Sequence, residues 1–263
     1  MKRRTCVVKL FVSIPALAFC LIQPLNGAES TASTKTNAAP DQAAAAEKAK
    51  QQEAELIKLF AKEEDTTNSL GTVMVWVKGA KGFRVAQYEI TQAQYSQVMG
   101  TNPSKFPGPQ YPVDSVTLDE ATQFCKKLTD KEVADRKLPK GYYYSLPTED
   151  QWESYVDDAS LKNAVTSYYG DRKNPEAVGI FPPNKLGLYD TRGSVWDLCD
   201  NNMARGGSWR SYDDYVFVQF RFALTSGQRY DDIGFRIILQ GSAQPAAPAT
   251  VPAVSATTIT KSK

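Results

Sequence analysis

The sequence contains no histidine, and this absence excludes several common catalytic and metal-binding chemistries. Ser-His-Asp and Cys-His nucleophilic catalysis both require an imidazole, as do histidine-bound iron, zinc and copper sites.

Cysteine is also scarce. Of the four cysteines, Cys6 and Cys20 lie within residues 1–28, the predicted signal peptide described below, which leaves Cys125 and Cys199. These two can form one disulfide or stay free, but they cannot make a disulfide-built scaffold.

The N-terminus has the pattern of a secretory signal peptide over residues 1–28. A basic start is followed by an apolar run from Leu10 to Ile22 and by small residues that end at Ala28. The run is short for a membrane span and is interrupted by Pro15. We therefore expect a secreted, periplasmic or cell-envelope protein that is not integral to the membrane after cleavage. A permanent anchor and a lipoprotein attached at Cys20 are the alternatives.

Neither sign of charge dominates, since the chain has 31 basic and 29 acidic residues and a formal charge of +2. Removing residues 1–28 takes away four basic residues and no acidic one, which changes the formal charge to −2. A nearly neutral protein has no electrostatic attraction to polyanions. Nucleic acid is therefore not an expected partner.

Composition divides the remaining chain into three parts. Residues 29–69 are predicted to be a disordered spacer followed by a helix, which extends from Asp41 to about Glu64 and carries apolar residues near its end. This helix would dock on the domain, or on a protein partner through residues 41–64. Residues 70–240 are predicted to form the folded domain. Residues 241–263 are rich in Pro, Ala and Thr and are predicted to be a disordered tail.

Within the domain, helix signals come early and strand signals are short. The β-rich runs 72–77 and 83–90 predict a hairpin. Thr91, Thr117 and Thr148 each precede a Gln or Glu by three residues, the capping-box spacing that starts a helix. In the second helix Cys125 lies on the apolar face, which favours a core residue over a reactive thiol. Short β-like runs at 220–224 and 235–239 follow a long irregular stretch. The order predicts an α+β fold with much loop.

A series of short motifs crosses the domain in a fixed order. They are Gln87-Tyr88-Glu89-Ile90-Thr91-Gln92, Asn102-Pro103-Ser104-Lys105-Phe106, Tyr111-Pro112-Val113, Leu146-Pro147-Thr148-Glu149, Gly187-Leu188-Tyr189-Asp190, Gly193-Ser194-Val195-Trp196-Asp197, Arg205-Gly206-Gly207-Ser208-Trp209 and Ile233-Gly234-Phe235-Arg236. This ordered set resembles the sulfatase-modifying-factor family, whose best-known member is the formylglycine-generating enzyme. The resemblance implies an irregular, loop-rich fold related to the C-type-lectin fold.

The same resemblance implies that the family's oxidation chemistry is absent. Its generating enzymes have two cysteines after Gly-Gly-Ser that bind copper, and this chain has Ser211 and Val216 at those positions. Neither residue supplies the thiolate that a Cu(I) site requires. A second branch uses histidine-bound iron, which this chain cannot hold. We therefore expect neither copper nor iron, and no formylglycine formation.

Family members often bind structural calcium through a Gly-Asn-x-Trp-Glu motif, which here has a shorter acid, Asp197. The resemblance implies a Ca²⁺ site formed by Asp197 and the backbone at Gly193 and Val195, because calcium prefers oxygen ligands. A hydrogen-bonded aspartate without metal is the alternative.

The leading functional hypothesis is a non-catalytic binding module that recognises a glycan or a peptide, because aromatic and charged side chains follow the Gly-Gly-Ser motif. The expected ligand-binding residues are Arg205, Ser208, Trp209, Arg210, Tyr212 and Tyr215. One alternative is an enzyme with non-thiol chemistry. Its general base would be Glu149, Asp197, Asp213 or Asp214. A structural component of the cell envelope is the other alternative.

Overall fold

The structure is a computed structural model and describes residues 38–79, 82–156, 161–168, 170–212 and 216–241. The chain divides into two units, and Ala44–Lys263 contains both sheets. Of Met1–Ala43, only residues 38–43 are described, and they are helical. The predicted signal peptide and nearly all of the predicted tail therefore lie outside the described residues. In the described part of the chain, no helix combines the length and the apolar character needed to cross a bilayer.

The described elements form an α+β fold, as the sequence predicts. The helices are α1 (Ala38–Phe60), α2 (Gln92–Met99), α3 (Leu118–Ala134), α4 (Glu149–Val156) and a 3-10 turn, η1 (Leu161–Asn163). The strands are β1 (Thr66–Thr67), β2 (Val73–Val77), β3 (Phe83–Ala86), β4 (Tyr142–Ser145), β5 (Trp196–Leu198), β6 (Met203–Arg205), β7 (Phe222–Ala223), β8 (Ile233–Gly234) and β9 (Ile238–Gly241).

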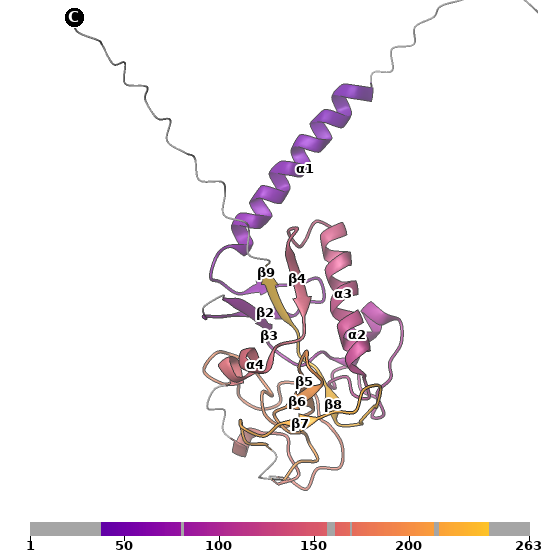
Figure 1. The fold of residues 1–263 in the computed structure, drawn as a ribbon, viewed down its shortest axis with the longest axis vertical. Helices are drawn as coiled ribbons and strands as arrows, with labels where there is room; N and C mark the ends of the chain where they lie inside the picture. Colours follow the sequence, from indigo (N-terminus) through magenta and orange to yellow (C-terminus); the bar gives the residue numbers. More distant parts are fainter. Residues whose placement is uncertain (1–37, 80–81, 157–160, 169, 213–215, 242–263) are drawn as a thin grey trace, which may run out of the picture. The chain divides into compact units, whose positions relative to one another are not determined.

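Two small sheets organise the domain (Figure 1). The first has the order β1-β2-β3-β9-β4 and its pairs are antiparallel; it contains the predicted hairpin of β2 and β3. The second has the order β7-β6-β5-β8, and β5 pairs with β8 in parallel. Because β8 and β9 follow one another in the chain, the last strands of the domain join the two sheets.

Capping boxes start the helices that pack beside the first sheet. In α3 the Thr117 hydroxyl accepts a hydrogen bond from the backbone N of Glu120 at 3.2 Å, and a Glu120 carboxylate oxygen accepts one from the backbone N of Thr117 at 3.0 Å. α2 has the same arrangement at Thr91, and α4 has it at Thr148 and Gln151. All three predicted helix starts are confirmed.

Replacing Thr117 by Ala is expected to lower the free energy of unfolding by about 1 kcal/mol, because the Glu120 N–H loses its acceptor. Urea denaturation measures the change. Thr122, which lies on α3 beyond its first turn, provides the control, and Thr122→Ala should change stability by less. Equal losses in the two variants would show that the cap adds nothing.

The main core lies between α3 and the sheets. Phe124 stacks on Tyr95 of α2 at a centroid distance of 5.7 Å and meets Phe235 edge-to-face at 5.3 Å. Cys125 belongs to this core and is free, as is Cys199, which is also buried. The expectation that Cys125 is a core residue is confirmed. Burial raises the pKa of Cys125 to about 12, so its thiol stays protonated near neutral pH.

The last turns of α1 dock on the first sheet. Phe60 is buried and lies 5.4 Å from the ring of Tyr142 in β4, and Leu56 packs against the same core. Arg84 of β3 donates to the carbonyls of Phe60 and Lys62. The predicted helix is confirmed, although it ends at Phe60 rather than at Glu64.

Candidate functional site

A groove with a volume of about 280 Å³ lies over the second sheet, beside the Gly-Gly-Ser motif. We refer to it as the aromatic groove. It is lined by Trp196, Arg210, Ser211, Tyr212, Phe220, Phe222, Tyr230 and Asp232. Trp196 comes from β5 and Phe222 from β7, so the pairing of strands in this sheet brings distant parts of the chain together.

One side of the aromatic groove consists of rings that pack on one another. The centroid of Trp196 lies 5.7 Å from that of Phe220 and 5.7 Å from that of Phe222, and Phe222 meets Tyr230 edge-to-face at 5.8 Å. Tyr212 is 66% exposed at the rim. Such packed rings form a fixed apolar surface with little side-chain entropy to lose on binding.

The other side of the aromatic groove is polar. The Ser208 hydroxyl donates to Asp232 Oδ2 at 2.8 Å, and the Ser211 hydroxyl accepts from the backbone N of Ser208 at 2.9 Å. Burial raises the pKa of Asp232, while the Ser208 hydrogen bond opposes this. Neighbouring Asp231 forms ion pairs with Arg210 at 2.8 Å and Lys105 at 2.5 Å. The polar side is therefore a pre-organised set of carboxylate, hydroxyl and guanidinium groups.

The structure places only some of the expected ligand-binding residues in this groove. Arg210 and Tyr212 line it, and Ser208 lies buried beneath it as a partner of Asp232. Trp209 is 5% exposed and packs edge-to-face on Phe106 at 5.5 Å. Tyr215 lies outside the described residues, as do Asp213 and Asp214.

Arg205 points away from the aromatic groove, into the space between β6 and α4. It is 1% exposed, and its guanidinium forms ion pairs with Glu149 at 2.7 Å and Glu153 at 2.6 Å. It also lies 4.9 Å from the ring centre of Trp152. These contacts give Arg205 a role in holding α4 on the second sheet.

The first glycine after Arg205 follows from the same packing. Gly206 has φ +89, and a Cβ there would lie 3.1 Å from both Trp152 Cζ2 and the carbonyl oxygen of Thr191. The backbone therefore approaches the Trp152 ring closely. A side chain at Gly206 would press on that ring and would also be strained by the positive φ.

Asp197 is part of a buried charge cluster with Glu89 and Arg236. Asp197 Oδ2 lies 3.5 Å from Arg236 Nε and accepts a hydrogen bond from the Trp152 indole at 3.2 Å. Glu89 accepts from the Ser194 hydroxyl at 2.8 Å and from the backbone N of Val195 at 3.2 Å. Burial raises the pKa of both acids, and Arg236 opposes this shift. The sequence analysis did not single out Glu89 or Arg236, although both lie in motifs that it quoted.

These contacts bear on the predicted calcium ligands Asp197, Gly193 and Val195. Among the described residues no three His, Cys, Asp or Glu side chains form a metal-binding group. A guanidinium beside the Asp197 carboxylate disfavours a divalent cation there, so these residues fit calcium poorly. Calcium binding stays a prediction.

Of the four acids named as general bases, the structure describes Glu149, which is held in ion pairs, and Asp197, which is buried. Glu149 accepts hydrogen bonds from Arg221, Asn201 and Arg205, and these, with Arg221 contributing most, lower the pKa of Glu149 to about 2. An acid with so low a pKa is a weak proton acceptor near neutral pH. Asp197 is shielded from solvent in the buried charge cluster.

Comparisons with known proteins agree with this architecture. Residues 75–240 match the family model described as the sulfatase-modifying factor enzyme 1-like domain. Among curated proteins, a relative named chaperone protein LppX from Paenibacillus barcinonensis is 24% identical over 223 residues, covering 59% of this chain and 79% of the relative.

Solved structures share the fold at low sequence identity. Treponema denticola variable protein 1 superposes with a TM-score of 0.58 at 22% identity, covering 67% of this chain and 99% of that one. PvdO from Pseudomonas aeruginosa superposes with a TM-score of 0.51 at 21% identity, covering 62% of this chain and 82% of that one. CarF gives a TM-score of 0.51 at 19% identity, covering 67% and 96%. At these identities the likeness concerns the fold.

Proposed function

The chain belongs to the sulfatase-modifying factor enzyme 1-like domain family, and on this basis we propose that it is an exported, non-catalytic module that binds protein segments in its aromatic groove. The observation that carries the proposal is the groove itself. It combines packed rings with a fixed polar side, and Ser211 lines it where the family resemblance expects a catalytic cysteine. A hydroxyl cannot replace that thiolate in copper chemistry.

A protein segment suits the apolar side of the aromatic groove. Phe220 and Phe222 have no hydrogen-bonding atoms in their side chains, so they accept apolar side chains better than hydroxyl-rich ligands. The rings pack on Trp196, which gives the firm apolar centre that protein-binding sites use. The name of the curated relative, a chaperone protein, supports a protein as the ligand.

A glycan is the second candidate, and one arrangement favours it. Asp232 and Arg210 lie on the polar side, and Tyr212 offers an exposed ring at the rim. A sugar can place its hydroxyls against such charged groups and its C–H face against a ring.

Replacing Tyr212 by Ser is expected to weaken peptide binding roughly fivefold to thirtyfold, the usual loss for an aromatic contact at a binding site. Fluorescence anisotropy with a labelled library of apolar peptides measures the effect, and a glycan array is run in parallel. Tyr143→Ser is the matched control, because Tyr143 is 41% exposed and lies on β4, outside the groove.

Peptide binding that Tyr212→Ser weakens and Tyr143→Ser leaves unchanged would support the proposal. Binding of glycans alone would establish the second candidate. If both substitutions had the same effect, the aromatic groove would not be the binding site.

Export is the part of the proposal that rests on residues 1–28. Cell fractionation combined with mass spectrometry of the mature N-terminus tests it. A mature chain starting near Glu29 outside the cytoplasm would support export, and a full-length chain in the cytoplasm would contradict it.

A further inference from the structure

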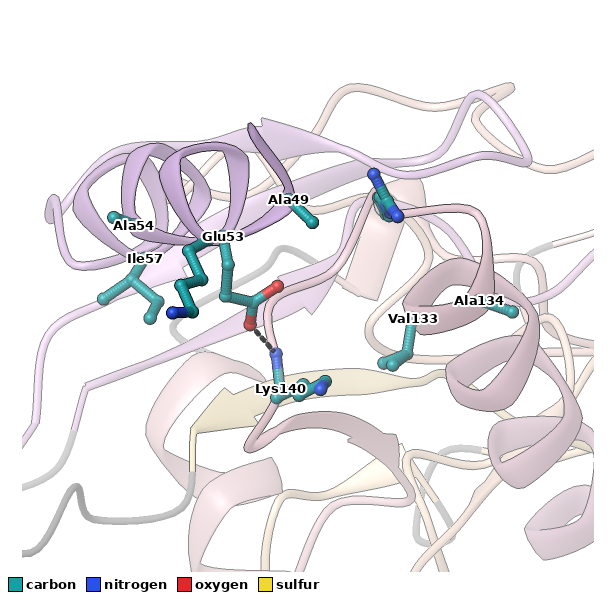
Figure 2. Close-up of a pocket in the computed structure, with 9 residues that line it drawn as sticks. Ala49, Glu53, Ala54, Ile57, Val133, Ala134 and Lys140 are labelled. Atoms are coloured by element: carbon teal, nitrogen blue, oxygen red, sulfur yellow. Dashed lines mark hydrogen bonds between the residues drawn. The ribbon is translucent and has the colours of Figure 1, made fainter. Parts of the chain in front are cut away.

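A second groove, of about 430 Å³, lies between α1 and the end of α3, on residues that the aromatic groove does not use (Figure 2). We refer to it as the basic groove. Its apolar floor is formed by Ala49, Ala54 and Ile57 of α1 and by Val133 and Ala134 of α3. Three of these five side chains are alanines, so the floor is shallow and open rather than a deep enclosed cavity.

Two hydrogen bonds tie the walls of the basic groove together. Glu53 Oε1 accepts from the backbone N of Lys140 at 2.7 Å, as the dashed line in Figure 2 shows. Arg136 Nη1 donates to Gln52 Oε1 at 2.9 Å. Further along α1, Leu56 and Phe60 pack into the main core. Hydrogen bonds and core packing therefore fix the position of α1 beside α3, and they define the shape of the basic groove.

The charge of the basic groove is positive. Three cations line it, Lys50, Arg136 and Lys140, against one carboxylate, Glu53, which already binds a backbone N–H. Within the described part of the chain neither Arg136 nor Lys140 has an ion-pair partner. Lys50 lies 3.8 Å from Glu47, an exposed pair of little strength.

Arg136 occupies a position where glycine is the usual residue. It follows the C-terminus of α3 with φ 55, in the left-handed region that side chains disfavour. Its N–H nevertheless closes the helix by donating to the carbonyl of Val133 at 3.1 Å. A strained position thus carries a cation at the edge of the groove.

The other side of α1 shows that the positive charge is specific to this groove. The surface there is lined by Lys48, Arg136, Glu55 and Asp135 among others, so its cations and acids balance. Counted over the described lining residues, the groove facing Lys140 has three cations and one carboxylate, whereas this surface has two of each and shares Arg136 with it.

We propose that the basic groove binds an acidic segment of a partner protein, with the acids meeting Lys50, Arg136 and Lys140 and small apolar residues lying on the alanine floor. A shallow, open floor suits a peptide better than an acyl chain, which needs an enclosed apolar cavity. The cations surround a concave surface, whereas a membrane would need them on a protruding one. The site gives α1 a second role besides docking.

The test uses the full chain and a labelled peptide of about 12 residues in which glutamate alternates with alanine and leucine, with a glutamine version as its control. The double variant Lys50→Gln and Lys140→Gln is expected to weaken binding of the glutamate peptide roughly tenfold. This variant keeps both hydrogen bonds between the walls of the groove, because Glu53 binds the backbone N–H of Lys140 and Arg136 is not replaced. Lys48→Gln, on the neutral side of α1, should leave binding unchanged.

Arg136→Gly provides a second variant. Glycine adopts the left-handed conformation without strain, so the end of α3 is kept, although the exposed hydrogen bond to Gln52 is lost together with the charge. It should also weaken the glutamate peptide, without lowering the melting temperature of the domain. Raising the salt concentration should weaken binding to the unsubstituted chain. Equal binding of the glutamine peptide, unchanged binding in the double variant, or binding only to vesicles containing phosphatidylglycerol would each overturn the proposal.

Discussion

Replacing Arg236 by Met is expected to lower the free energy of unfolding by about 3–5 kcal/mol near neutral pH, the usual cost of removing one partner from a buried ion pair. The Arg236 side chain is fully buried, and its guanidinium acts electrostatically on both Asp197 and Glu89. It also donates to the carbonyls of Ala86 at 2.9 Å and Tyr189 at 2.7 Å. Methionine fills a similar volume but supplies neither the charge nor the donors.

Urea denaturation followed by tryptophan fluorescence measures this loss. Arg229→Met is the matched control, because Arg229 also forms an ion pair, with Glu120 at 2.6 Å, but its side chain is 46% exposed. The control should lose no more than about 1 kcal/mol. If Arg236→Met were as mild as Arg229→Met, the buried charge cluster would not stabilise the domain.

The cost of Arg236→Met should shrink as the pH falls from about 8 to about 5. Burial already raises the pKa of Glu89 well above its ordinary value, and loss of Arg236 raises it further. When the pKa of an acid is higher in the folded state than in the unfolded state, the folded protein is favoured most at a pH below both pKa values. This contribution to the free energy of unfolding is lost as the pH rises through the folded-state pKa. In this window, each extra proton that the folded state binds lowers the free energy of unfolding by about 1.4 kcal/mol for every unit by which the pH rises. Unfolding curves of both proteins at the two pH values test the sign, and a cost that grew at low pH would contradict it.

Local features of the fold could be predicted from the sequence because they depend on residues close together in the chain. The capping boxes at Thr91, Thr117 and Thr148 need only a spacing of three residues, and each starts a helix. The hairpin of β2 and β3 also follows from neighbouring runs. The apolar face of α3 placed Cys125 in the core for the same reason.

The second sheet could not be predicted, since its strands have only two or three residues and their pairing is not local. β5 pairs with β8 in parallel, and nothing in three residues such as Trp196–Leu198 specifies a partner so far along the chain. The aromatic groove depends on this pairing, because Trp196, Phe222 and Tyr230 meet only once the sheet has formed. The sequence indicated Ser208, Arg210 and the rim residue Tyr212, but neither Asp232 nor the packed rings of the aromatic side.

The direction of a side chain was the other feature that the sequence could not supply. Arg205 stands beside Gly206 and Ser208 in the motif, which suggested a shared surface. In the structure Ser208 faces Asp232 under the groove, while Arg205 faces Glu149 and Glu153 of α4. Two glycines between them allow the chain to turn, so adjacency in sequence did not mean a common site.

Replacing Trp152 by Ala is expected to lower the free energy of unfolding by about 3–5 kcal/mol, as for other large buried rings. The ring is fully buried, lies 4.9 Å from the Arg205 guanidinium and meets Tyr155 edge-to-face at 6.4 Å. Its removal leaves a cavity beside Gly206, which has no side chain to fill it. Urea denaturation gives the loss, and Tyr143→Ala, at an exposed ring, should change stability little.

Trp152→Phe separates the volume of the ring from its N–H group. Phenylalanine keeps most of the volume but cannot donate to Asp197, whose Oδ2 accepts the indole N–H at 3.2 Å. The expected loss is about 1–3 kcal/mol, the cost of leaving a buried acceptor without its donor. Because this part depends on the charge of Asp197, it should shrink as the pH falls and that acid takes up a proton, whereas the cavity cost of Trp152→Ala should not. If the Phe variant lost no stability at any pH while the Ala variant did, the indole N–H would contribute nothing, and Trp152 would hold α4 on the sheet through the volume of its ring alone.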